Sequence, residues 1–192
     1  MPCFRDWRTD ASKPRHWARH LYEIRTLQQR TGGFTEFVPL SFVHMEAPMY
    51  LKGNSRRGPT FREAILMHAV PRIVFHTLID NIQTSWVKMG HEGAAACLRA
   101  GANDLGGTLM NESITRAAGS LHGQEWTPAS IENHINSLGR QSRMRTTLYA
   151  DATNERKAAA LGATELEETV NEGAGKTQRS KRKLGADIQS IV

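Results

Sequence analysis

The sequence has little cysteine: Cys3 and Cys97 are the only two in 192 residues. Two cysteines are too few for the disulfide framework of a small secreted domain. They also do not form the C-x-x-C pair that is typical of zinc and thiol-redox sites. We therefore predict no metal site and expect a reducing, cytoplasmic setting.

Long apolar runs are also missing. No stretch of about 18 apolar residues could span a bilayer, and residues 1–30 lack the uninterrupted apolar core of a secretory signal. The sequence therefore predicts a protein with no membrane partner.

The excess of positive charge is not concentrated in the centre of the chain. The net charge is +6, yet residues 31–150 carry eleven Lys or Arg against nine acidic residues. The basic stretch Lys176–Lys183 contains no aromatic residue that could stack on a base. We predict no nucleic-acid partner, although a basic nucleic-acid-binding protein that uses the first helix and the tail remains an alternative.

The apolar pattern predicts an α/β fold. The expected elements are a helix over 12–33, strands over 34–42, 81–87 and 103–108, and helices over 60–75, 92–100, from about 111, and over 129–138. Alternating helices and strands produce a parallel sheet with helical crossovers. Thr60 and Glu63 predict a capping box, and Pro71 predicts a kink or break in the helix that follows it.

The composition changes after Tyr149, where the chain becomes polar. We therefore expect an α/β region over 14–150 and a polar tail over 151–192, and we leave residues 1–13 unassigned. Within the tail we expect a weak helix over 152–170 and disorder over Asn171–Lys183.

Polar residues gather at or after the expected strands, where active-site groups of parallel α/β folds collect. The candidates for ligand contact are Glu36, His44, Gln83, Ser85, Lys88, Asn103, Asp104, Thr108, Asn111 and Glu112. For Glu36 and Gln83, hydrogen bonding between strands is an equal alternative. Asp104 precedes two glycines and could instead hold a turn, and Lys88 could be a solvated charge.

Several segments together resemble the FO synthase family, specifically its CofH-like half. They are PRHWARHL, TGGFTEFVPLSFVH, NIQTSWVKMG, GANDLGGTLMNESITRAAG, HGQE and RTTLY, in that order between Pro14 and Tyr149. The long GANDLGGTLMNES segment is the most specific of them. The related menaquinone-pathway enzymes look less similar there.

The resemblance implies the C-terminal part of a radical S-adenosylmethionine (β/α) barrel of the TIM type. It implies S-adenosylmethionine and a 4Fe-4S cluster as cofactors, with tyrosine and 5-amino-6-ribitylaminouracil as substrates in deazaflavin biosynthesis. The ten polar candidates would then bind substrate, and Val38 and Pro39 would line the cofactor. Individual catalytic roles stay unassigned.

The sequence departs from this family in one decisive respect. The family's C-x-x-x-C-x-x-C cluster motif is absent, and a full barrel needs about 250 residues. We therefore expect an incomplete barrel whose cluster ligands lie outside this chain and whose partner is an N-terminal radical S-adenosylmethionine half. A non-catalytic remnant is the alternative.

Overall fold

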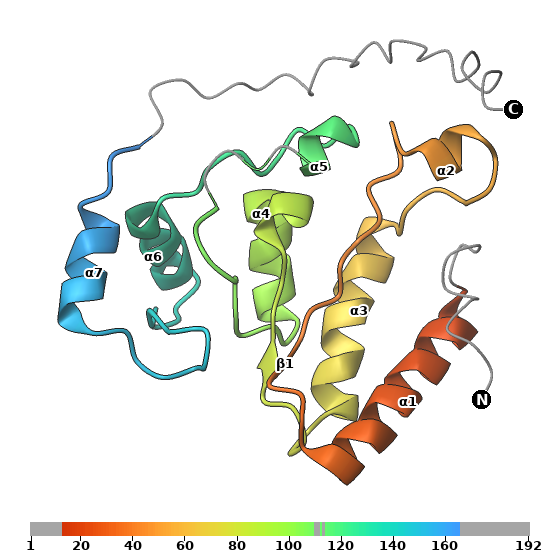
Figure 1. The fold of residues 1–192 in the computed structure, drawn as a ribbon, viewed down its shortest axis with the longest axis horizontal. Coiled ribbons are helices and arrows are strands. Elements are labelled where there is room, and N and C mark those ends of the chain that lie inside the picture. The colour runs from red at the N-terminus through yellow and green to blue at the C-terminus, as the bar shows by residue number, and fades with distance from the viewer. Residues whose placement is uncertain (1–12, 110–111, 113, 166–192) are drawn as a thin grey trace, which may run out of the picture.

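The computed structural model describes residues 13–109, 112 and 114–165 (Figure 1). Helix α1, Pro14–Thr31, begins with proline in its first turn and ends at Gly32, which adopts the left-handed conformation with φ of 60°. The expected first helix is thus confirmed over most of its length. Ser12, where we expect the first helix to begin, and Asn171–Lys183, for which we expect disorder, lie outside the described residues.

The strands are parallel but shorter than the sequence predicts. Strand β1, Glu36–Phe37, pairs in parallel with β2, Asn81–Ile82, and the third expected strand is reduced to a parallel bridge between Gln83 and Asp104. The order in space therefore follows the order in the chain. The prediction of a strand continuing to Phe42 is wrong, because the chain beyond Phe37 leaves the ladder and Pro39 has no N–H to donate.

Helix α3, Phe61–Val74, follows a loop that contains the short helix α2, Pro48–Leu51. The predicted capping box is present: Thr60 Oγ1 accepts from the Glu63 backbone N–H, and the Glu63 carboxylate accepts from the Thr60 N–H. The predicted break at Pro71 is wrong. Helix α3 continues through this proline, which lies in its last turn, so the missing N–H removes one hydrogen bond close to the helix end.

Helix α4, Trp86–Arg99, starts earlier than predicted, so the expected strand over 81–87 ends before Trp86. Gly90 interrupts the helix with φ of 68° and ψ of 177°, which divides it at a kink. The sequence located only the second part, because the glycine separates the first turn from the alanine-rich run.

The remaining helices are α5, Ile114–Ala117, α6, Pro128–Ser137, and α7, Asn154–Leu161. Thr127 caps α6 by accepting a hydrogen bond from the Ser130 N–H, as the Thr-Pro pair predicts. Within the described residues, no helix is long and apolar enough to cross a membrane.

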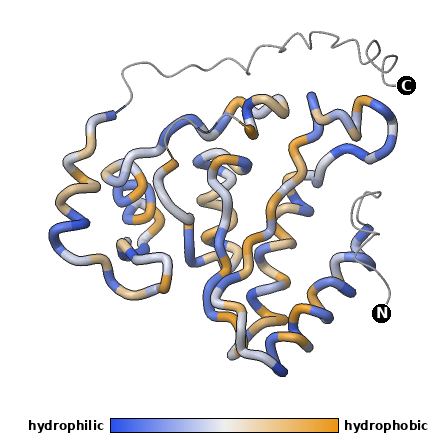
Figure 2. Tube along the Cα trace, viewed as in Figure 1, coloured by the Kyte–Doolittle hydropathy of each residue, from blue (hydrophilic) through white to orange (hydrophobic). Residues whose placement is uncertain are grey.

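Two apolar clusters hold these elements together. One joins Leu21 of α1 and Phe75, which caps α3, to Phe37 and Ile82 of the strands. The other surrounds α4 and includes Trp126. Figure 2 shows that the chain from β1 towards α2 is also largely apolar, yet Leu40 there is 66% exposed. The described structure is therefore an α/β arrangement with apolar surface beside its first strand.

Candidate functional site

One face of the strands is covered by helices and the other is not. Phe37 and Ile82 are paired in register and buried against α1 and α3. Because side chains alternate along a strand, Glu36 and Gln83 belong to the opposite, free face. Asp104 forms the bridge with Gln83 and so shares that face. The structure thus brings together three of the ten predicted residues.

Both carboxylate oxygens of Asp104 have hydrogen-bond partners within the protein. Oδ1 accepts the Gly106 N–H at 2.6 Å. Oδ2 accepts from Arg145 Nε at 2.6 Å and pairs with Arg145 Nη2 at 2.5 Å. The Asp104 side chain is only 7% exposed. The turn-holding alternative for Asp104 is therefore realised, together with an ion pair that the sequence did not predict.

Glu36 belongs to the same network. Tyr149 donates its phenolic hydrogen to Glu36 Oε2 at 2.5 Å, and Arg145 Nη2 lies 3.7 Å from that oxygen. The Arg145 guanidinium also lies over the Tyr149 ring, 4.1 Å from its centroid. Burial, together with the hydrogen bond to Glu36, raises the pKa of Tyr149, so the phenol remains a donor across the physiological range.

Sequence reasoning missed Arg145 and Tyr149 as site residues. The segment RTTLY contributes to the family resemblance, but nothing in its local pattern indicates that it contacts the strands. The two contacts join residues 41 and 113 positions apart. Only the tertiary fold brings them together.

Asn103 is also occupied by structural contacts. Its Oδ1 accepts from Arg72 Nη2 at 2.6 Å and from the Ile82 N–H at 2.8 Å, and its amide nitrogen donates to Asp80 O. These bonds tie the third strand segment to β2 and α3.

A second group lies after the carboxyl ends of the strands. Lys88, in the first turn of α4, reaches Thr115 Oγ1 at 3.5 Å, and the Glu112 carboxylate accepts the Thr115 N–H at 3.0 Å. Burial lowers the pKa of Lys88, and the nearby Glu112 carboxylate opposes that shift. Ser85 precedes Lys88 at the N-cap of α4, and its side chain makes no capping hydrogen bond.

The other predicted residues are more scattered. Thr108 is exposed, and His44 lies in the loop before α2 with its ring edge-on to Tyr50. Val38 and Pro39 are half-buried just after β1. Asn111 lies outside the described residues.

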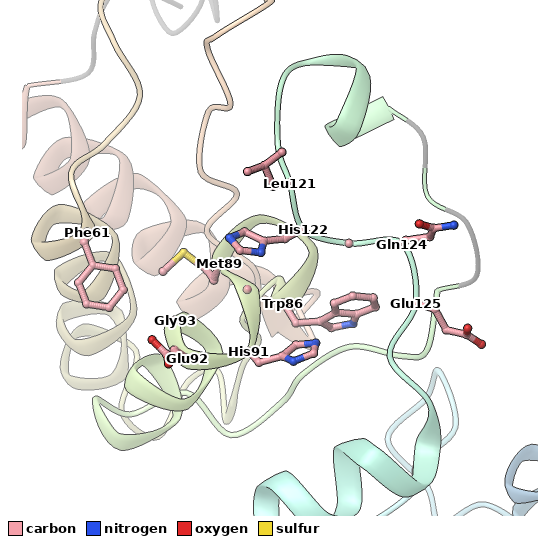
Figure 3. A pocket seen from close by; sticks show the side chains of 12 residues that line it. Phe61, Trp86, Met89, His91, Glu92, Gly93, Leu121, His122, Gln124 and Glu125 are labelled. Carbon is pink, nitrogen blue, oxygen red and sulfur yellow. The ribbon is translucent and has the colours of Figure 1, made fainter. Parts of the chain in front are cut away.

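A pocket of about 530 Å³ lies beside the kink in α4 (Figure 3). Its walls come from the start of α3, the kinked part of α4 and the segment 121–125, and Figure 3 shows the rings of His91, His122 and Trp86 around it. None of the twelve predicted ligand residues lines this pocket. In the sequence, the HGQE segment, residues 122–125, drew attention to part of this pocket.

The described residues do not fit an iron-sulfur cluster. They contain no group of three or more His, Cys, Asp or Glu side chains that could hold a metal ion. Cys97 is buried, its Sγ lies 3.5 Å from His68 Nδ1, and burial raises its pKa, so it stays a thiol in the core. A cluster needs several convergent thiolates, which this chain does not offer.

Comparison with known proteins gives a consistent match. The family model for the CofH/MqnC C-terminal region matches residues 31–158. The chain is 55% identical over 137 residues to FO synthase of Mycobacterium leprae and 51% identical over 148 residues to FO synthase of Streptomyces coelicolor. It is 52% identical over 136 residues to the 5-amino-6-(D-ribitylamino)uracil–L-tyrosine 4-hydroxyphenyl transferase of Methanopyrus kandleri.

These matches cover much of this chain and a small part of each relative. They span 71%, 77% and 71% of the chain, but only 16%, 17% and 37% of the three relatives. The matched region includes both strands, the Asp104–Arg145 pair and the group around Lys88. By this family match, the chain belongs to the CofH/MqnC C-terminal region family.

Proposed function

We propose that this chain forms the C-terminal part of a radical S-adenosylmethionine barrel of the FO synthase type. The complete enzyme would join a hydroxybenzyl group derived from tyrosine to 5-amino-6-ribitylaminouracil in deazaflavin biosynthesis. The observation that carries this proposal is the identity of 51% or more to FO synthases over a region that includes the strands and their polar carboxyl ends.

The geometry supports a barrel segment. Parallel strands in chain order, each followed by a helix, are the repeating unit of a (β/α) barrel. A barrel also needs further strands beside β1. Exposed apolar side chains lie on either side of β1 in the chain, with Phe34 at 38%, Leu40 at 66% and Phe42 at 41% exposure. An N-terminal barrel half, on the same polypeptide or on another, would cover them.

The polar group at the carboxyl ends supports substrate binding. Lys88 offers a partly desolvated ammonium, and Glu112 and Ser85 add a carboxylate and a hydroxyl in the same group. A ribityl-uracil with many hydroxyl and amide groups requires such a set of hydrogen-bonding partners. Val38 and Pro39 remain our candidates for contact with the adenine of S-adenosylmethionine.

We assign the ligands of the iron-sulfur cluster to the other half of the barrel. When bound there, it would cleave S-adenosylmethionine and supply the radical. The residues of this chain would bind and orient the substrate.

The experiment mixes the purified chain with an N-terminal FO synthase half under anaerobic conditions, with iron and sulfide. We expect cluster absorption wherever the N-terminal half is present, and formation of the hydroxybenzyl–uracil product from tyrosine and the uracil only when both parts are present. A cluster held by this chain alone would contradict our assignment of the ligands, and an inactive mixture would favour a non-catalytic remnant.

Lys88→Met tests the substrate group in that mixture. Removing a charged hydrogen-bond donor should lower the kcat/KM for the uracil by roughly tenfold or more. Lys52→Met is the matched control, because Lys52 is exposed in the loop after α2. Equal activity of the two variants would remove Lys88 from the substrate site.

A further inference from the structure

Arg145 contacts two carboxylates that the sequence analysis predicted to bind substrate. Asp104 and Glu36 both contact Arg145 Nη2, at 2.5 Å and 3.7 Å. One cation therefore serves two carboxylates, and its own side chain is only 21% exposed. Such a shared, largely buried cation is costly to remove, because both carboxylates would then lose their counter-ion.

The backbone conformation and the side-chain contacts of Tyr149 indicate that it takes part in the same network. It is one of two described non-glycine residues with positive φ, at 62°, a conformation that side chains with a Cβ rarely adopt. In this conformation its hydroxyl reaches Glu36 and its ring lies against the Arg145 guanidinium. The strained backbone is thus compensated by a hydrogen bond and a cation–π contact.

The segment that carries both residues is a small closed turn. An antiparallel bridge joins Arg145 to Asp151, and the Thr146 N–H donates to Ala150 O at 2.8 Å. In Figure 1 this segment, between α6 and α7, lies at the level of β1, whereas α2 and α5 lie at the other end of the strands. It is therefore separate from the group that contains Lys88 and Glu112.

We infer that Arg145 and Tyr149 form a clamp that reserves the carboxylates of Asp104 and Glu36 for fixing the 143–151 segment to the free face of the strands. Asp104 and Glu36 are accordingly positioning residues, and substrate contacts belong to the carboxyl-end group. The assignment of substrate contacts rests on the proposed function, whereas the clamp itself does not.

The clamp is tested by the pH dependence of unfolding in the isolated full chain. Arg145→Met leaves two neighbouring carboxylates without their cation, so the folded protein should take up a proton that the unfolded chain does not need. We expect the unfolding equilibrium constant to rise on the order of 100-fold at pH 7. Because protonation relieves the repulsion, the difference from wild type should shrink at pH 5.

The control is Arg143→Met in the same segment. Arg143 pairs with Asp151 at 2.6 Å, but both side chains are more than 60% exposed. Breaking this exposed pair should change the unfolding constant less than about fivefold. Adding Asp104→Asn to Arg145→Met should flatten the pH dependence, because one of the unpaired charges is then gone.

The possible outcomes distinguish a failure of the clamp from a failure of the proposed function. If Arg145→Met resembles Arg143→Met, or if its effect is the same at pH 5 and pH 7, the clamp is overturned. In the mixture with the N-terminal half, Asp104→Asn and Tyr149→Phe should leave the KM for tyrosine and for the uracil within about twofold, assayed well below the unfolding midpoint. A larger rise in KM would return these residues to the substrate site, whereas an inactive wild-type mixture would contradict only the proposed function.

Discussion

The role of an individual residue could be predicted from the sequence where its partners are close neighbours in the chain. The capping pair Thr60 and Glu63 and the helix end at Gly32 needed only neighbours three or four positions away. Asp104 shows the opposite case. Its charge in an apolar strand indicated a required partner, but the sequence offered substrate and turn equally, and the actual partner is a distant arginine.

His68 gives a prediction at the residue scale. This histidine is 1% exposed in α3, and burial lowers its pKa, although a hydrogen bond to Ala64 O partly opposes the shift. The unfolded residue titrates near 6.5. Below about pH 6.5 the unfolded chain therefore binds a proton that the folded chain does not, so the free energy of unfolding should fall as the pH falls.

Denaturant unfolding between pH 7.5 and pH 5 measures this fall. His68→Leu should reduce it, because leucine has no imidazole to protonate. His76→Gln removes an exposed histidine and should leave the fall nearly unchanged. An identical slope in His68→Leu and wild type would show that other groups cause the dependence.

At the scale of elements, the contact between α4 and the segment 121–125 depends on a glycine. A Cβ at Gly123, where φ is 99°, would lie 2.4 Å from Val87 Cγ1. Val87 is buried in the cluster around α4 and cannot move away easily. Gly123 itself lines the pocket beside the kink in α4.

Gly123→Ala should therefore lower the free energy of unfolding by about 1–3 kcal/mol, as overpacking of a core does. Gly107→Ala is the control, since a Cβ there meets no atom within 4 Å. Thermal unfolding of both variants is the measurement. A Gly123→Ala variant as stable as Gly107→Ala would mean that the segment yields to the added methyl group.

At the scale of the whole molecule, the family match and the composition place the end of the folded region close together. The family model ends at residue 158, within α7, and composition predicts a polar tail after residue 150. We propose that residues 14–150 form the cooperative unit and that Asn171–Val192 adds nothing to its core.

Deleting residues 171–192 should leave the unfolding midpoint unchanged within about 1 °C, because polar, apolar-poor segments bury little surface. Circular dichroism during heating compares the full and shortened chains. A lowered midpoint would assign the tail a place in the folded unit.

The sequence by itself determined most of the longer helices, the parallel α/β class and the family, because caps, apolar periodicity and motifs act over short distances, but it did not predict α2 or the first turn of α4. It also determined that the cluster ligands are missing from this chain, since two cysteines cannot supply them. The tertiary structure alone decided the partners of the charged residues. Glu36, Asp104, Arg145 and Tyr149 meet only when the chain folds, because a buried charge takes whichever counter-ion the packing places beside it.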